Sequence, residues 1–291
     1  MDGESTLDRS VFSHYSWFEL WGPLYLGFAV ILFYLYYRKF IRSSIYPASK
    51  SQVRYFIAAL ILFYIVKGTP IAIVADHYLF GAHVLQLSVI FFIVTPLIVL
   101  SLPVEYLRQL FWHYKMKFTL KALSHPWVTA IFFNGLLSAY LAPPVFNVLK
   151  ENVMLLYLAQ VILLIHAFLM WWTIITPLPE INKLENLIKI AYIFFTSILL
   201  MPIGFFLLVI QNDYYPFYEA VAGELFPALT PIYDQQLAGG ILKITQLTSY
   251  AYALLFITLS WGRAEEEKEG QVEDENIRVI QGIVIHNPKK D

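Results

Sequence analysis

The chain has 291 residues, of which 58% are hydrophobic and only 14% are charged. Ordinary soluble domains carry roughly a quarter charged residues, so this composition excludes a soluble globular protein, a disordered chain and a coiled coil. The apolar residues form long runs, which makes the lipid bilayer the solvent for most of the chain. The net charge of −1 indicates no nucleic-acid partner, and the absence of cysteine excludes disulfides and thiolate metal sites.

Seven apolar segments predict an all-α, polytopic bundle of seven transmembrane helices. All but the second reach the roughly 20 residues that a helix needs to cross a hydrocarbon core about 30 Å thick. The second is interrupted at Lys67-Gly68-Thr69-Pro70, so it either continues as a kinked helix or ends inside the bundle. The predicted spans are residues 17–37, 55–66, 78–102, 127–146, 153–175, 190–210 and 237–261.

Positive charge predicts the orientation of this bundle. Sixteen Lys and Arg residues fall in the C-terminal tail and in the connections after the first, third and fifth spans, whereas three fall on the opposite side. Because basic connections stay in the cytoplasm, we expect the N-terminus outside and the C-terminus inside. The seven Trp all lie near predicted span ends, as the interfacial preference of indole requires.

The charge distribution also predicts that the chain divides into two parts, a membrane domain and a charged tail. Residues 1–262 are expected to form the transmembrane domain. Residues 263–291 are expected to form a charged cytoplasmic tail, because the run AEEEKEGQVEDEN indicates a solvated and partly disordered extension. Within this tail, residues 277–285 could pair as a strand with a partner.

Polar residues at the expected outer end of the third span form the first candidate site. Asp76-His77 precedes the span, and His83 and Gln86 follow three residues apart, on one helix face. Polar groups inside lipid are costly and often functional, so this region is a candidate metal or proton site. The alternative is that Asp76 caps the helix and His77 is an interfacial anchor.

His166, near the middle of the fifth span, is a third candidate metal ligand beside His77 and His83. At 1.5 Å per residue, His166 lies about 20 Å from the outer end of its span and His83 about 8 Å from the outer end of its own. This difference of roughly 12 Å disfavours ligation of one haem iron by the pair. His166 either binds a ligand or forms a hydrogen bond to a neighbouring helix.

The last span begins with the polar run DQQLAGGILK. Lys243 at its end either snorkels to the outer surface or pairs with Asp234 or Asp76. Gly239-Gly240 would permit close helix approach. We expect one outer polar cavity to be shaped by Asp76, Gln86, Asp234, Gln235 and Lys243.

Several sequence pieces, in order between residues 20 and 250, carry a family resemblance. They are LWGP (20–23), FYIVKGTP (63–70), FGAHVLQL (80–87) with TPLIVLSLP, FNGLLSAY (133–140), HAFLMWW (166–172) with TPLPE, and DQQLAGGILK (234–243). Together they resemble the polytopic CtaG-type cytochrome c oxidase assembly factors of Gram-positive bacteria. The resemblance implies a multi-pass plasma-membrane protein needed to form active caa-type cytochrome c oxidase, with oxidase subunits as partners and a role near the copper centres.

The chain departs from the family pattern at three positions. Val84 and Leu242 stand where relatives often have Met, and Leu141 stands where they often have His. Three soft or imidazole donors are therefore absent, which weakens direct copper carriage. These absences favour assembly through protein contact, or through a role related to haem or lipid.

The leading functional hypothesis is a non-enzymatic assembly factor acting in the outer half of the bilayer. His83, with His77 or Gln86, would bind copper transiently or position an oxidase subunit. Two alternatives remain open. A transporter for copper or a small solute would need polar groups continuing to the inner side. A membrane enzyme acting on haem or lipid would need acid–base groups or metal ligands at one depth.

Overall fold

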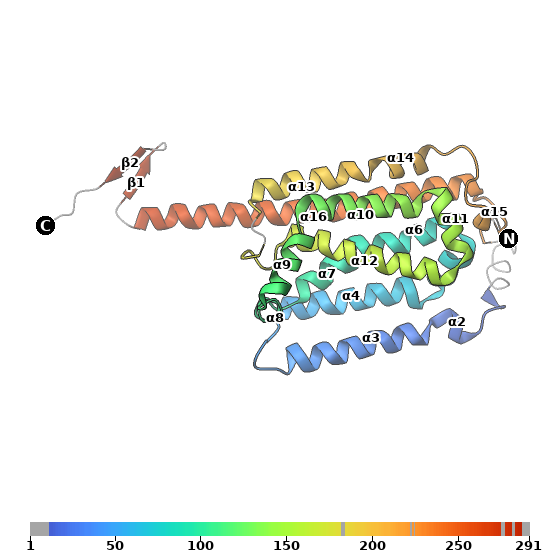
Figure 1. The fold of residues 1–291 in the computed structure, drawn as a ribbon, viewed down its shortest axis with the longest axis horizontal. Helices are drawn as coiled ribbons and strands as arrows, with labels where there is room; N and C mark the ends of the chain where they lie inside the picture. The colour runs from blue at the N-terminus through green and yellow to red at the C-terminus, as the bar shows by residue number, and fades with distance from the viewer. Residues whose placement is uncertain are drawn as a thin grey trace, which may run out of the picture.

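The computed structural model describes residues 12–181, 184–221, 223, 225–274, 277–280 and 283–286. Long helices lie side by side and form a bundle with two distinct ends (Figure 1). We name these the α15 end and the α9 end. The helices are α2 (Trp17–Trp21), α3 (Pro23–Tyr36), α4 (Lys50–Gly68), α5 (Pro70–Ile73), α6 (Phe80–Val89), α7 (Thr95–Ser101), α8 (Val104–Leu110), α9 (Tyr114–Leu123), α10 (Pro126–Leu141), α11 (Pro143–Glu151), α12 (Val153–Ile175), α13 (Asn186–Leu199), α14 (Met201–Val209), α15 (Pro216–Glu219) and α16 (Pro231–Asp274).

Three π-helical turns extend these helices, namely η1 (Tyr37–Ile41), η2 (Val74–Tyr78) and η3 (Ile90–Val94). The turn η3 joins α6 to α7, and the three together form the third span. Within the apolar window of this span 61% of the residues are buried, against 6% for the span that contains α3. The third span is therefore the centre of the bundle, and α3 lies at its periphery beside α4 (Figure 1).

The prediction of an all-helical membrane bundle is confirmed. Among the described residues, six helices or joined helices are long and apolar enough to span a membrane, and the bent pair α10–α11 gives a seventh. The two helices of that pair meet at 72°, so α11 crosses the α15 end (Figure 1). The bend falls at Pro143-Pro144, which supply no backbone N–H to continue α10.

The predicted second span is longer than expected. It is the 19-residue helix α4, which begins at Lys50 because Ser49 and Gln52 form a capping box. It ends inside the bundle, since Lys67 and Gly68 are buried. Thr69 then caps the short helix α5. The structure thus shows both alternatives for this segment: the end of α4 is buried, and helical turns continue after the break at Thr69 as α5 and η2.

Gly239 allows the backbones of α14 and α16 to pack closely. A Cβ at Gly239 would lie 2.8 Å from the backbone nitrogen of Leu208 and 3.0 Å from the carbonyl oxygen of Gly204. The expected close approach is confirmed here. At Gly240, in contrast, a Cβ would meet only a leucine methyl group at 3.8 Å.

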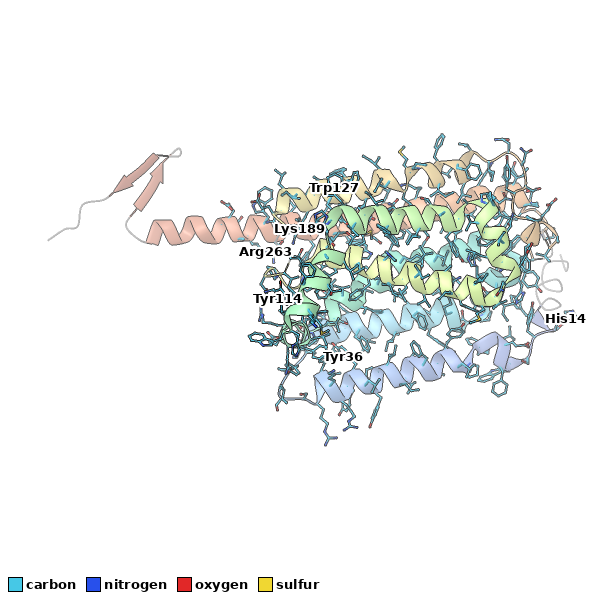
Figure 2. All side chains as sticks on the ribbon, viewed as in Figure 1. His14, Tyr36, Tyr114, Trp127, Lys189 and Arg263 are labelled. Carbon is cyan, nitrogen blue, oxygen red and sulfur yellow. The ribbon has the colours of Figure 1, made fainter. Side chains whose placement is uncertain are left out.

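The basic connections gather at the α9 end. Figure 2 shows Lys189 and Arg263 at this end, with Trp127 and Tyr114, and His14 at the opposite end. Beside them, Arg108 of α8 forms an ion pair with Glu180 across 2.6 Å. This guanidinium holds the pKa of the Glu180 carboxyl below its usual value. The asymmetry of basic residues seen in the sequence is thus an asymmetry between two ends of the bundle.

The helix α16 continues beyond the bundle to Asp274 (Figure 1). The predicted boundary at residue 262 therefore falls within one helix, although the division into membrane domain and tail stays a prediction. A short antiparallel hairpin follows, in which β1 (Ile277–Ile280) pairs with β2 (Ile283–His286). The strand expected over residues 277–285 thus pairs within the chain. Residues 287–291 of the predicted tail lie outside the described residues.

Candidate functional site

The position of the candidate site is set by a helix cap that comes from a distant segment. The first residues of α6 have no capping side chain of their own. The Asp234 carboxylate of α16 instead accepts hydrogen bonds from the backbone N–H groups of Phe80 at 2.7 Å and Gly81 at 3.0 Å. A Cβ at Gly81 would lie 2.7 Å from this carboxylate, so a larger residue here would displace the carboxylate from its two hydrogen bonds. Asp234 therefore fixes the depth of α6 relative to α16.

His83 lies one turn further along α6 and is completely buried. Its Nε2 is 2.9 Å from the hydroxyl oxygen of Tyr140 on α10. The edge of the Phe146 ring packs against its imidazole, with ring centroids 5.3 Å apart. Its Nδ1 has no hydrogen-bond partner among the described residues. Since buried polar atoms are almost always paired, this nitrogen is the unusual atom of the site.

A chain of hydrogen bonds joins His83 to three further helices. Gln160 of α12 donates to the Tyr140 hydroxyl at 3.1 Å. Lys67 of α4 donates to the side-chain oxygens of Gln160 at 3.4 Å and Gln86 at 3.1 Å, and Gln86 donates to the carbonyl oxygen of Val66. We call this set the polar cluster; it consists of Lys67, His83, Gln86, Tyr140 and Gln160.

Lys67 is a buried cation, and no carboxylate of the described residues lies within ion-pair distance of it. The ion pair between Arg108 and Glu180 is the one salt bridge among the described residues, and it lies at the other end of the bundle. Amide oxygens hold the ammonium group instead, and the position in the last turn of α4 favours a cation. Burial of a charge costs several kcal/mol unless it is hydrogen-bonded, so both amide contacts are needed.

Aromatic side chains from α11 and α15 close the cluster at the α15 end. Phe146 packs on His83, and Tyr215 stacks on Phe80 with ring centroids 3.9 Å apart. The hydroxyls of Tyr215 and Tyr218 donate to backbone carbonyl oxygens, at 2.6 and 2.8 Å respectively. Burial raises the pKa of both phenols above its ordinary value, so they remain donors. The cluster is therefore enclosed rather than open to water.

Lys150 holds in place the aromatic cover, which consists of Phe146, Tyr215 and Tyr218. Its Nζ donates to the backbone carbonyl oxygen of Asp76 at 2.8 Å and to the Tyr218 hydroxyl at 3.1 Å. The same ammonium group lies 4.5 Å from the ring centroid of Phe217. Lys150 thus ties α11 to η2 and α15, which keeps the cover in place above His83.

The three predicted metal ligands do not come together. His77 is exposed, with its ring 6.2 Å from that of Tyr15. His166 is half-buried on α12, where its Nδ1 lies 2.8 Å from the carbonyl oxygen of Ile162 and its ring stacks on the exposed Phe132. No group of three His, Asp or Glu side chains able to hold a metal occurs among the described residues. The metal-binding role of each histidine stays a prediction.

The other predicted cavity residues divide into separate sites. Gln86 belongs to the polar cluster, and Asp234 is the cap of α6. Gln235 of α16 donates to Asp213, in the loop between α14 and α15, at 3.0 Å. Lys243 contacts neither Asp234 nor Asp76; it donates to the Gln246 side-chain oxygen at 2.6 Å and packs over Gly204. The Asp76 backbone, rather than its carboxylate, receives Lys150.

Sequence reasoning missed four participants in this region. Lys67 was interpreted as a break in an apolar run, and Lys150 only as one of the few basic residues on the outer side. Tyr140 and Gln160 are a lone phenol and a lone amide within apolar spans. A polar side chain in a span is itself a signal of function, and this rule could have found Gln160.

The bundle and its enclosed cluster define a polytopic membrane protein with one polar site near the α15 end. The family model of the cytochrome c oxidase caa3 assembly factors (Caa3_CtaG) matches residues 31–264. The chain therefore belongs to this family of assembly factors, and the resemblance found in the sequence is confirmed. No curated protein and no solved structure matches the chain.

Proposed function

We propose that this assembly factor assists maturation of the copper centre of caa-type cytochrome c oxidase at the outer face of the plasma membrane. The proposed role is non-enzymatic: the protein would pass or expose copper, or hold an oxidase subunit while copper enters. Membership of the family supports the oxidase as partner. The copper role rests on the polar cluster around His83.

Charge supports an external location for the cluster. The basic connections at the α9 end would face the cytoplasm, which leaves the α15 end outside. His83 then lies in the outer half of the bilayer. The same orientation places the N-terminus outside and the charged tail in the cytoplasm.

The unpaired Nδ1 of His83 is the observation that carries the proposal. Imidazole nitrogen is a good ligand for copper, and a single imidazole gives an exchangeable contact rather than a permanent centre. Among the described residues, no three His, Asp or Glu side chains lie together to hold resident copper. Copper is therefore proposed as transient cargo, reached when the aromatic cover of Phe146, Tyr215 and Tyr218 opens.

The packing of the interior favours an assembly role over transport. Beyond the cluster, Phe91 and Phe92 pack edge-to-face on Phe133, with centroids 6.0 and 5.8 Å apart. All three are buried. A solute path to the α9 end would have to pass this aromatic layer.

His83→Ala, with His83→Gln as a variant that retains polarity, tests the proposal. We expect oxidase activity at the level of a strain lacking the gene, with the assembly factor present in membranes at its normal amount. His166→Ala is the matched control, because that imidazole lies outside the cluster, and it should retain activity. Normal oxidase activity in both His83 variants would remove His83 from the site.

A further inference from the structure

A groove of about 420 Å³ lies between α10 and α13, far from the polar cluster. It is partly open, and its walls are formed mainly by Trp127, Ile188, Ala191, Tyr192 and Phe195, with His125 and Leu184 also lining it. The indole of Trp127 packs edge-to-face on Phe195, with ring centroids 4.9 Å apart. The hydroxyls of Tyr192 and Thr129 lie 2.8 Å apart and are hydrogen-bonded. These contacts keep the groove formed.

The groove lies where the helices leave the apolar part of the bundle. Figure 2 shows Trp127 and Lys189 at the α9 end. Further along the same helices, apolar side chains are exposed, namely Ile131 and Phe132 on α10 and Phe194 and Ile198 on α13. In a membrane these faces meet lipid chains, so the groove continues a lipid-facing surface up to the interface.

Two lysines are neighbours of groove-lining residues in the sequence. Lys189 follows Ile188 on α13 and is half-buried, and the exposed Lys121 of α9 precedes His125 by four residues. No acidic residue occurs between Glu105 and Glu151, so α9 carries three lysines and no carboxylate. The acidic residue nearest the groove in sequence is Glu185, which is exposed at the start of α13. The local charge is therefore positive.

We propose that this groove binds one chain of an anionic phospholipid, with the lipid headgroup against Lys121 and Lys189. The walls provide apolar and aromatic contacts for an acyl chain, and the two ammonium groups complement a lipid phosphate at the level of the membrane interface. The bilayer supplies this occupant directly, because the groove is continuous with lipid-facing surfaces. The site is independent of the copper role proposed for His83.

Quenching of Trp127 fluorescence tests the site in the purified full-length protein. Brominated phosphatidylglycerol and brominated phosphatidylcholine are titrated into detergent micelles, and the signal of a Trp127→Phe variant is subtracted. We expect phosphatidylglycerol to quench at about thirtyfold lower concentration, since each lysine near an anionic lipid contributes about fivefold. The double variant Lys121→Gln/Lys189→Gln should abolish this difference.

Two controls make the outcome specific. Lys50→Gln/Arg54→Gln removes two cations from the same end of the bundle but from α4, and should leave the preference intact. Ala191→Phe fills the groove and should reduce quenching by both lipids. Equal quenching by the two lipids in the unmodified protein, or an unchanged preference in the Lys121/Lys189 variant, would overturn the proposal. Trp127 protected from both lipids by a co-purifying protein would assign the groove to a partner helix and likewise overturn it.

Discussion

Replacement of Asp234 by alanine tests how α6 and its histidine are held. The carboxylate accepts two backbone hydrogen bonds from the start of α6, and its residue is 4% exposed. Hydrogen bonds to a charged group contribute about 1.5–3 kcal/mol each, and loss of a helix cap typically costs about 1 kcal/mol. The helix cap is itself one of these two hydrogen bonds, so its contribution is not counted twice. We therefore expect Asp234→Ala to lower the free energy of unfolding by about 3 kcal/mol.

Thermal unfolding of the purified protein in detergent measures this loss. A loss of about 3 kcal/mol corresponds to a fall in Tm of roughly 6–12 °C for a large domain. Asp213→Ala is the matched control, because that carboxylate is exposed and accepts one side-chain hydrogen bond, from Gln235, within the described part of the chain. It should shift Tm by a small fraction of that amount. A change below about 1 kcal/mol for Asp234→Ala would refute the idea that this cap fixes α6.

Three further outcomes follow from the packing and the charges. Gly239→Ala should lower Tm by several degrees and Gly240→Ala should not, because only the first Cβ would meet the backbone of α14 below 3.0 Å; equal effects would contradict the close approach. Lys67→Met should cost about 1–3 kcal/mol, since it removes the donor from the buried amide oxygen of Gln86 and the half-buried one of Gln160, and should reduce oxidase activity as His83→Ala does; a neutral result would separate Lys67 from the site. The Arg108–Glu180 pair contributes stability above the ordinary glutamate pKa of about 4.3, and this contribution is lost as the pH falls through the lowered pKa of Glu180. Arg108→Gln should therefore change Tm slightly at pH 7, and by progressively less as the pH falls through the lowered pKa of Glu180.

Most of the bundle could be predicted from hydropathy, because each span must bury its own backbone hydrogen bonds in lipid. Two helix boundaries were harder to predict from hydropathy. The beginning of α4 lies within a basic segment, where a capping box decides the start. The sharp turn into α11 was signalled by Pro143-Pro144, but a proline pair marks a break without giving its direction.

The candidate site was predictable only where its members share one helix. His83 and Gln86 lie three residues apart, so one helix face brings them together. Their partners Lys67, Tyr140 and Gln160 come from three other helices, and sequence periodicity does not say which spans are neighbours. His166 shows the same limit, because α12 is apolar on all sides and its pattern identifies no lipid-facing side.

We propose that this assembly factor serves the copper centre of the oxidase. The most direct test uses membranes from a strain that lacks the gene. Cytochrome c oxidase activity and the reduced-minus-oxidised spectrum of the a-type haem are recorded with and without added copper. We predict lost activity with the haem signal retained, and recovery of activity with copper. Loss of both signals would contradict the copper role and indicate haem insertion or subunit stability, and normal activity with a normal spectrum would contradict an oxidase role altogether.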